Sequence, residues 1–98
     1  MTDDTPVAVF TIPAEHPALP GHFPGRPIVP GVVLLDHVLE ALAAHATALP
    51  SVKFLHPVRP GDPVEILASA AQPGRLAFTC RVHGRDVVRG TVLLAPPE

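Results

Sequence analysis

Apolar and polar residues alternate in the second half of the chain, whereas apolar residues cluster without alternation near its middle. The alternation is clearest at 76–83, where Leu, Phe, Cys and Val occupy every second position. A period of two is typical of a β-strand with one buried face. Short apolar runs rich in β-branched residues predict further strands at 7–12, 51–55, 64–71 and 87–94.

Turn residues separate the strands of the second half. Combinations of Gly and Pro with polar residues predict turns at 60–63, 72–74 and 84–85. Connections this short join neighbouring strands, so we expect an antiparallel meander.

The middle of the chain predicts one helix over 31–49. After Gly31 this segment contains no Gly or Pro, and Leu and Ala dominate it. Pro30 suits the position before the first turn, and Pro50 is expected to end the helix after about five turns of ~3.6 residues. Because the helix is apolar nearly all the way round, we expect it to be buried on most sides. A curved sheet is the element able to enclose it.

A loop precedes this helix. The segment 13–30 contains six prolines and two glycines, which predict an irregular, preorganised connection. The order of elements is therefore strand, loop, helix and antiparallel meander. We expect a single α+β domain over 1–98, with a curved antiparallel sheet wrapped around one long central helix.

Composition narrows the classes of function. The 98 residues carry a net charge of −2, no basic run, and no Trp or Tyr, which argues against nucleic acid as a ligand. Only 16% of the residues are charged, so we expect another subunit to cover part of the surface. The single cysteine, Cys80, excludes an internal disulfide and any multi-cysteine metal site, and we expect it to be a buried apolar filler.

Two further observations concern the compartment. The N-terminal residues are acidic and lack the apolar core of a signal peptide. Four ionisable residues, Asp36, His37, Glu40 and His45, interrupt the apolar segment 31–49, which argues against a transmembrane helix. We therefore expect a cytoplasmic protein with no membrane association.

Three residues around the loop and the helix start form a candidate acid–base site. His22 lies in the stiff loop, and imidazole is well matched to proton abstraction near neutral pH. Asp36 lies within the apolar helix, where desolvation is expected to raise the pKa of its carboxyl and make it a proton donor. The N–H of Gly31, at the helix start, can stabilise a developing enolate oxygen. Together they indicate elimination or addition of water next to a carbonyl group.

Each of these residues also has a simpler interpretation. His22 can be an ordinary loop histidine that makes a hydrogen bond. Asp36 can belong to an exposed helix face that it shares with Glu40 and His37. The other five histidines share no metal-ligand spacing, and we expect them to be surface or hydrogen-bonding residues.

At these residues the sequence resembles the hot-dog-fold 3-hydroxyacyl-[acyl carrier protein] dehydratases, the FabA/FabZ family. The resemblance rests on GHFPGRPIVPGV at 21–32 and on VKFLHPVRPGD at 52–62, the latter similar to the strand and turn that follow the family's helix. The short length is similar to that of the small ApeI-like dehydratases of aryl polyene pathways.

The resemblance implies a function and roles for particular residues. It implies dehydration of a 3-hydroxyacyl thioester to the trans-2-enoyl thioester, with His22 as base, Asp36 as acid and the Gly31 N–H on the thioester carbonyl. The motif residues Phe23, Pro30 and Val32 are expected to contact the substrate. Most members of the shorter-motif branch carry Glu at the acid position, and Asp is similar to the branch that also isomerises the double bond.

The resemblance also implies partners. The two catalytic residues are expected from opposite subunits of a homodimer or of a heterodimer with a second hot-dog subunit. The substrate is carried on the phosphopantetheine of an acyl carrier protein, and no metal or bound cofactor is expected. Two alternatives remain open, namely a hot-dog acyl-CoA thioesterase and a non-catalytic subunit or carrier-binding module.

Overall fold

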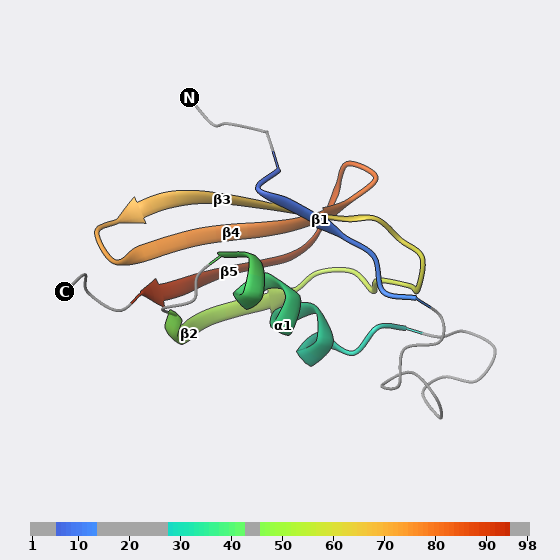
Figure 1. Cartoon of the computed structure of the whole chain (residues 1–98), viewed down its shortest axis with the longest axis horizontal. Coiled ribbons are helices and arrows are strands. Elements are labelled where there is room, and N and C mark those ends of the chain that lie inside the picture. The colour runs from blue at the N-terminus through green and yellow to red at the C-terminus, as the bar shows by residue number, and fades with distance from the viewer. Residues whose placement is uncertain (1–5, 14–27, 43–45, 95–98) are drawn as a thin grey trace.

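The computed structural model of the protein describes residues 6–13, 28–42 and 46–94. Within these residues the chain forms one five-stranded antiparallel sheet, in the order β1-β3-β4-β5-β2, and one helix (Figure 1). The elements are β1 (Ala8–Phe10), α1 (Gly31–Leu42), β2 (Ala46–Phe54), β3 (Val64–Gln72), β4 (Arg75–Val82) and β5 (Arg85–Leu94).

The predicted meander is confirmed. Strands β3, β4 and β5 pair in sequence order, and the side chains of Phe78, Cys80 and Val82 on β4 are buried while their neighbours are more exposed. The last turn lies one residue earlier than the predicted 84–85. Val82 pairs with Arg85, which leaves His83 and Gly84 as a two-residue turn with φ of 49° and 80°. Two left-handed residues are what a type I′ hairpin requires, and Arg85 is therefore free to begin β5.

The helix is shorter than predicted. It ends at Leu42, and β2 already begins at Ala46, so the prediction of a helix to residue 49 is wrong. Pairing of Ala46 and Ala48 with β5 overrides the helical propensity of this segment. Pro50 lies within β2, where the register shifts between Ala48 and Ser51. Because β2 is an edge strand with an irregularity, it tolerates a residue that lacks an N–H.

The core lies between α1 and one face of the sheet (Figure 1). Val33, Leu34 and Val38 are the buried residues of the helix, and they pack with side chains from β3, β4 and β5. Cys80 is fully buried there as predicted, and burial raises the pKa of its thiol to about 12.

The opposite side of α1 is open in the single chain. Val32 is 70% exposed, and Asp36 and Glu40 are exposed as well. The prediction of a helix buried on most sides is therefore wrong for one chain by itself, since the sheet covers only one stripe of it. No helix in the described ranges has the length and hydropathy needed to cross a membrane.

Candidate active site

The start of α1 is held by backbone hydrogen bonds. The carbonyl of Pro30 accepts the N–H of Val33 at 3.0 Å and of Leu34 at 3.4 Å, which makes Pro30 the residue before the first turn, as predicted. The N–H of Val29 donates to the carbonyl of Val58 at 2.7 Å and ties this segment to the chain that follows β2. Gly31 is the first helical residue, so its N–H has no acceptor within the helix.

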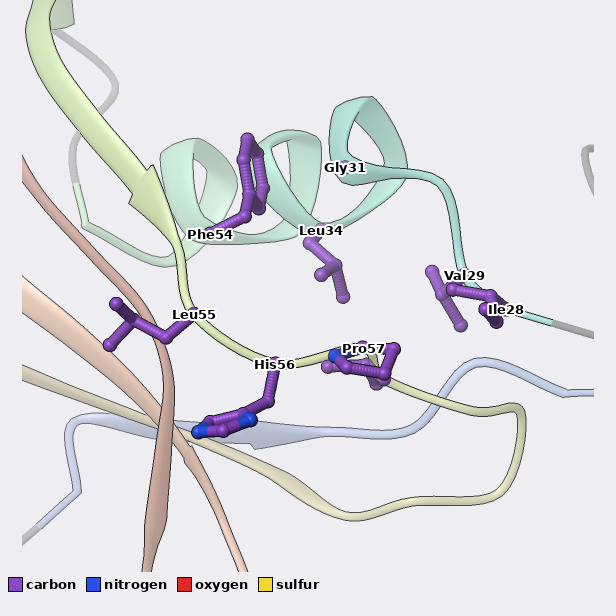
Figure 2. Close-up of a pocket in the computed structure, with 9 residues that line it drawn as sticks. Ile28, Val29, Gly31, Leu34, Phe54, Leu55, His56 and Pro57 are labelled. Carbon is purple, nitrogen blue, oxygen red and sulfur yellow. The ribbon is translucent and has the colours of Figure 1, made fainter.

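A cavity of about 360 Å³ lies beside this helix start. Figure 2 shows the N-terminal half of α1 on one side of it and the end of β2 with the following segment on the other. The lining is mostly apolar and comprises Ile28, Val29, Gly31, Leu34, Phe54, Leu55, His56, Pro57 and Val58. An apolar cavity at a helix start can hold a thioester, and a backbone N–H of that helix start can polarise its carbonyl oxygen.

Asp36 does not line this cavity. It lies five residues after Gly31, which rotates it about 140° around the helix at 3.6 residues per turn. Its side chain is exposed, so one chain does not provide the desolvation that the apolar neighbourhood predicts. In the single chain Asp36 and Glu40 share an exposed face, which is the simpler interpretation of this residue.

The remaining predicted site residues either lie outside the described ranges or lie away from the cavity. His22 and Phe23 lie outside the described residues. Pro30 and Val32 are described, but neither lines the cavity. Among the predicted residues that the structure describes, Gly31 is the one that lines the cavity.

Sequence reasoning missed the other wall of the cavity. Phe54, Leu55, His56 and Pro57 all lie in the 52–62 stretch, which the resemblance identifies only as a strand and a turn. One signal could have identified these residues. The stretch resembles the family just as GHFPG does, and loops often carry functional sites.

A second hollow, of about 480 Å³, shares His56 and Pro57 with the cavity. Its lining includes Arg59, His83 and Arg85, with Asp62 as the acidic residue. The carboxylate of Asp62 accepts the backbone N–H of Arg59 at 3.0 Å, and among the described residues it forms no ion pair with either arginine. We call this hollow the basic hollow. It can bind an anion.

Two other arginines are already paired. Arg81 Nε lies 3.0 Å from one carboxylate oxygen of Asp86, and Arg89 Nη2 lies 2.9 Å from the other. In the part of the chain that the structure describes, no group of three or more His, Cys, Asp or Glu residues is placed to hold a metal ion.

The sequence profile of the ApeI-like family, described as ApeI dehydratase, matches residues 1–91. The chain belongs to the ApeI-like dehydratase family. Curated FabZ dehydratases resemble it as well. The FabZ enzyme of Rhizobium rhizogenes is 30% identical in an alignment 77 positions long, which covers 65% of this chain and 49% of that protein. The enzyme of Thermus thermophilus is 27% identical over 87% of this chain and 72% of that protein. The chain therefore spans about half the length of the first relative and under three quarters of the second.

Solved structures share the fold. The dehydratase heterocomplex ApeI:P from Xenorhabdus doucetiae matches with a TM-score of 0.73 at 22% identity, over 89% of this chain and 83% of that one. An uncharacterised protein from Erwinia carotovora matches with a TM-score of 0.74 at 25% identity, over 90% and 80% of the two chains. This ApeI-like chain thus has the α+β hot-dog fold that the resemblance implies, with a helix three turns long.

Proposed function

We propose that the protein converts a 3-hydroxyacyl thioester to the trans-2-enoyl thioester with release of water. The observation that carries the proposal is the Gly31 N–H at the start of α1, beside an apolar cavity of about 360 Å³. Membership of the ApeI-like family supports it. The names of the FabZ relatives, 3-hydroxyacyl-[acyl-carrier-protein] dehydratases, support the substrate class.

The proposed mechanism uses one base, one acid and one oxyanion donor. His22 removes a proton from C2 of the substrate, and the electron pair passes toward the thioester carbonyl, whose oxygen the Gly31 N–H stabilises. Collapse of the enolate forms the C2–C3 double bond and breaks the C3–O bond. Asp36 protonates the departing hydroxyl, which leaves as water. No metal or bound cofactor takes part.

A second subunit completes the proposed site. Asp36 is exposed and turned away from the cavity at Gly31 of its own chain, so it is available to a cavity in a partner. Burial against that partner would also supply the desolvation that the single chain lacks. The partner is a second copy or another hot-dog subunit. The solved heterocomplex from Xenorhabdus doucetiae supports the second arrangement.

We further propose an acyl carrier protein as the cytoplasmic partner that delivers the substrate. Its phosphopantetheine arm carries a phosphate, and the basic hollow next to the cavity offers Arg59 and Arg85 to that anion. The two sites share His56 and Pro57, so one arm can reach both.

A dehydration assay tests the reaction. Purified protein is incubated with 3-hydroxyacyl thioesters of several chain lengths, and mass spectrometry follows the loss of water. We expect His22→Ala and Asp36→Asn each to lower turnover by at least about 100-fold, since each removes a proton-transfer group. Glu40→Gln, on the same exposed face as Asp36, is the control and should retain activity.

The outcomes separate the alternatives. Undiminished turnover by His22→Ala would contradict the proposed base. Release of free thiol from an acyl-CoA would indicate a thioesterase instead. Binding of an acyl carrier without turnover, even with a candidate partner present, would indicate a non-catalytic subunit.

The carrier site has its own test. We expect replacement of both Arg59 and Arg85 by Ala to raise the KM for a carrier-bound substrate about tenfold, and the effect should shrink as salt is added. A truncated thioester without a phosphate is the control, because its KM should not change. Equal effects on both substrates would show that the arginines do not recognise the phosphate.

A further inference from the structure

Phe54 packs directly against the backbone of Gly31. A Cβ built at Gly31 would lie 2.7 Å from Cζ and 2.9 Å from Cε1 of the Phe54 ring, closer than real side chains approach. The two residues come from different elements, the end of β2 and the start of α1, and both line the cavity. Figure 2 shows the phenyl ring projecting from the end of β2 toward the helix.

The backbone conformation at position 31 does not require a glycine. The glycines with positive φ in the described ranges are Gly61, Gly74 and Gly84, so the conformation of Gly31 is open to any residue. Glycine is also a poor helix former, less favourable than Ala by up to about 1 kcal/mol. What distinguishes the position is the ring that occupies the space of a side chain.

The ring is incompletely covered by the protein. Phe54 is 52% exposed in the single chain, which is unusual for so large an apolar side chain beside the core. Its contact with Gly31 therefore contributes little to the buried core. It instead forms the part of the cavity wall that lies against Gly31.

We propose that Phe54 is a positioning residue that fixes the backbone of Gly31, and with it the N–H, beside the cavity. This inference rests on the proposed function, because it concerns the oxyanion donor of that reaction. A preorganised donor stabilises an oxyanion only where it is held in place, and a displacement of about 1 Å can cost up to about 100-fold in rate. The effect belongs to the transition states on either side of the enolate, since negative charge on the oxygen is present there but not in the bound ground-state substrate.

Kinetics of four proteins test the proposal: wild type, Gly31→Ala, Phe54→Ala and the double variant. We expect Phe54→Ala to lower kcat about tenfold and to change KM less than about threefold, since the N–H is displaced but the cavity remains. Gly31→Ala should lower kcat similarly, because its methyl group pushes the half-exposed ring aside. The double variant should be no slower than Phe54→Ala, because the added methyl then meets no ring.

Multiplied losses in the double variant would overturn the proposal, because Gly31 would then matter for a reason other than the ring. A change confined to KM in Phe54→Ala would also overturn it, since the ring would then only bind substrate. Thermal unfolding of all four proteins identifies any variant that fails to fold, and Phe54→Leu replaces Phe54→Ala in that case.

A measurement without substrate separates this inference from the dehydratase function. An aromatic ring above Gly31 shifts the NMR signals of its α-protons, and Phe54→Leu should abolish that shift. Phe10→Leu is the control and should leave the Gly31 signals unchanged. If wild type shows the ring-dependent shift but no dehydration, the packing stands and the proposed function fails. If Phe54→Leu leaves the signals unchanged, the positioning role fails whatever the activity.

Discussion

At the scale of single residues, Asp86 shows how one ion-paired carboxylate contributes to the stability of the sheet. Its carboxylate accepts hydrogen bonds from Arg89 and from Arg81, which together lower its pKa below the ordinary value of 3.8. A carboxyl with a lowered pKa stabilises the fold at pH values above the ordinary pKa. That contribution is lost as the pH falls through the folded-state pKa.

We therefore expect Asp86→Asn to destabilise the protein near pH 7 by no more than about 1 kcal/mol, because all three side chains are partly exposed. Urea unfolding of wild type and variant at pH 7 and at pH 3 measures the difference. The difference should shrink as the pH falls below 3.8 and be smaller at pH 3 than at pH 7. Glu40→Gln serves as the control, and a gap that persists unchanged at low pH would contradict the role of the ionised carboxylate.

At the scale of elements, the close approach of strands in the middle of the sheet depends on Gly90. This residue lies on β5 between β4 and β2, opposite Phe78 and Val52. A Cβ there would lie 2.6 Å from the carbonyl oxygen of Ser51 and 2.7 Å from the Phe78 ring. Because one of these atoms belongs to the backbone, a shift of one side chain cannot make room.

Gly90→Ala should consequently destabilise the fold by about 1–3 kcal/mol, the usual cost of overpacking a core. Gly84→Ala is an informative comparison, since its Cβ would meet nothing within 4 Å but its φ of 80° strains any L-residue. That strain is expected to cost about 1–2 kcal/mol without disturbing the sheet. Denaturant unfolding compares the two variants. Loss of less than about 0.5 kcal/mol in Gly90→Ala would show that the strands adjust.

At the scale of the whole molecule, the open side of α1 is the feature that a single chain leaves incomplete. Val32 is 70% exposed at the first turn, and Asp36 lies exposed one turn further on. A low content of charged residues and the exposed Val32 together favour burial against another subunit. This arrangement is the one that our proposed two-subunit site needs.

We expect wild-type protein, alone or with its partner subunit, to assemble, and Val32→Asp to prevent that assembly because a charge would be buried in the interface. Light scattering after gel filtration measures the mass, and circular dichroism checks that the variant is folded. Val9→Asp, at a valine of similar exposure on β1, should assemble normally. A Val32→Asp protein that still assembles would place the interface elsewhere.

Local patterns in the sequence were sufficient to predict the meander and the start of the helix. Alternation at 76–83 depends only on which face of a strand is buried, and a proline before a helix depends only on its missing N–H. Both are properties of neighbouring residues. The GHFPG and VKFLHPVRPGD stretches likewise carried the family and, with it, the class of reaction that we propose.

Only the tertiary structure decided where the helix ends and what surrounds Gly31. Residues 46–49 have helical propensity but gain more from pairing with β5, a strand almost fifty residues away. The contact of Phe54 with Gly31 similarly joins residues that are distant in sequence, so no local pattern reports it. The exposure of Asp36 follows from the sheet covering one stripe of α1 alone. In each case the deciding interaction is long-range, and it exists only once the sheet has formed.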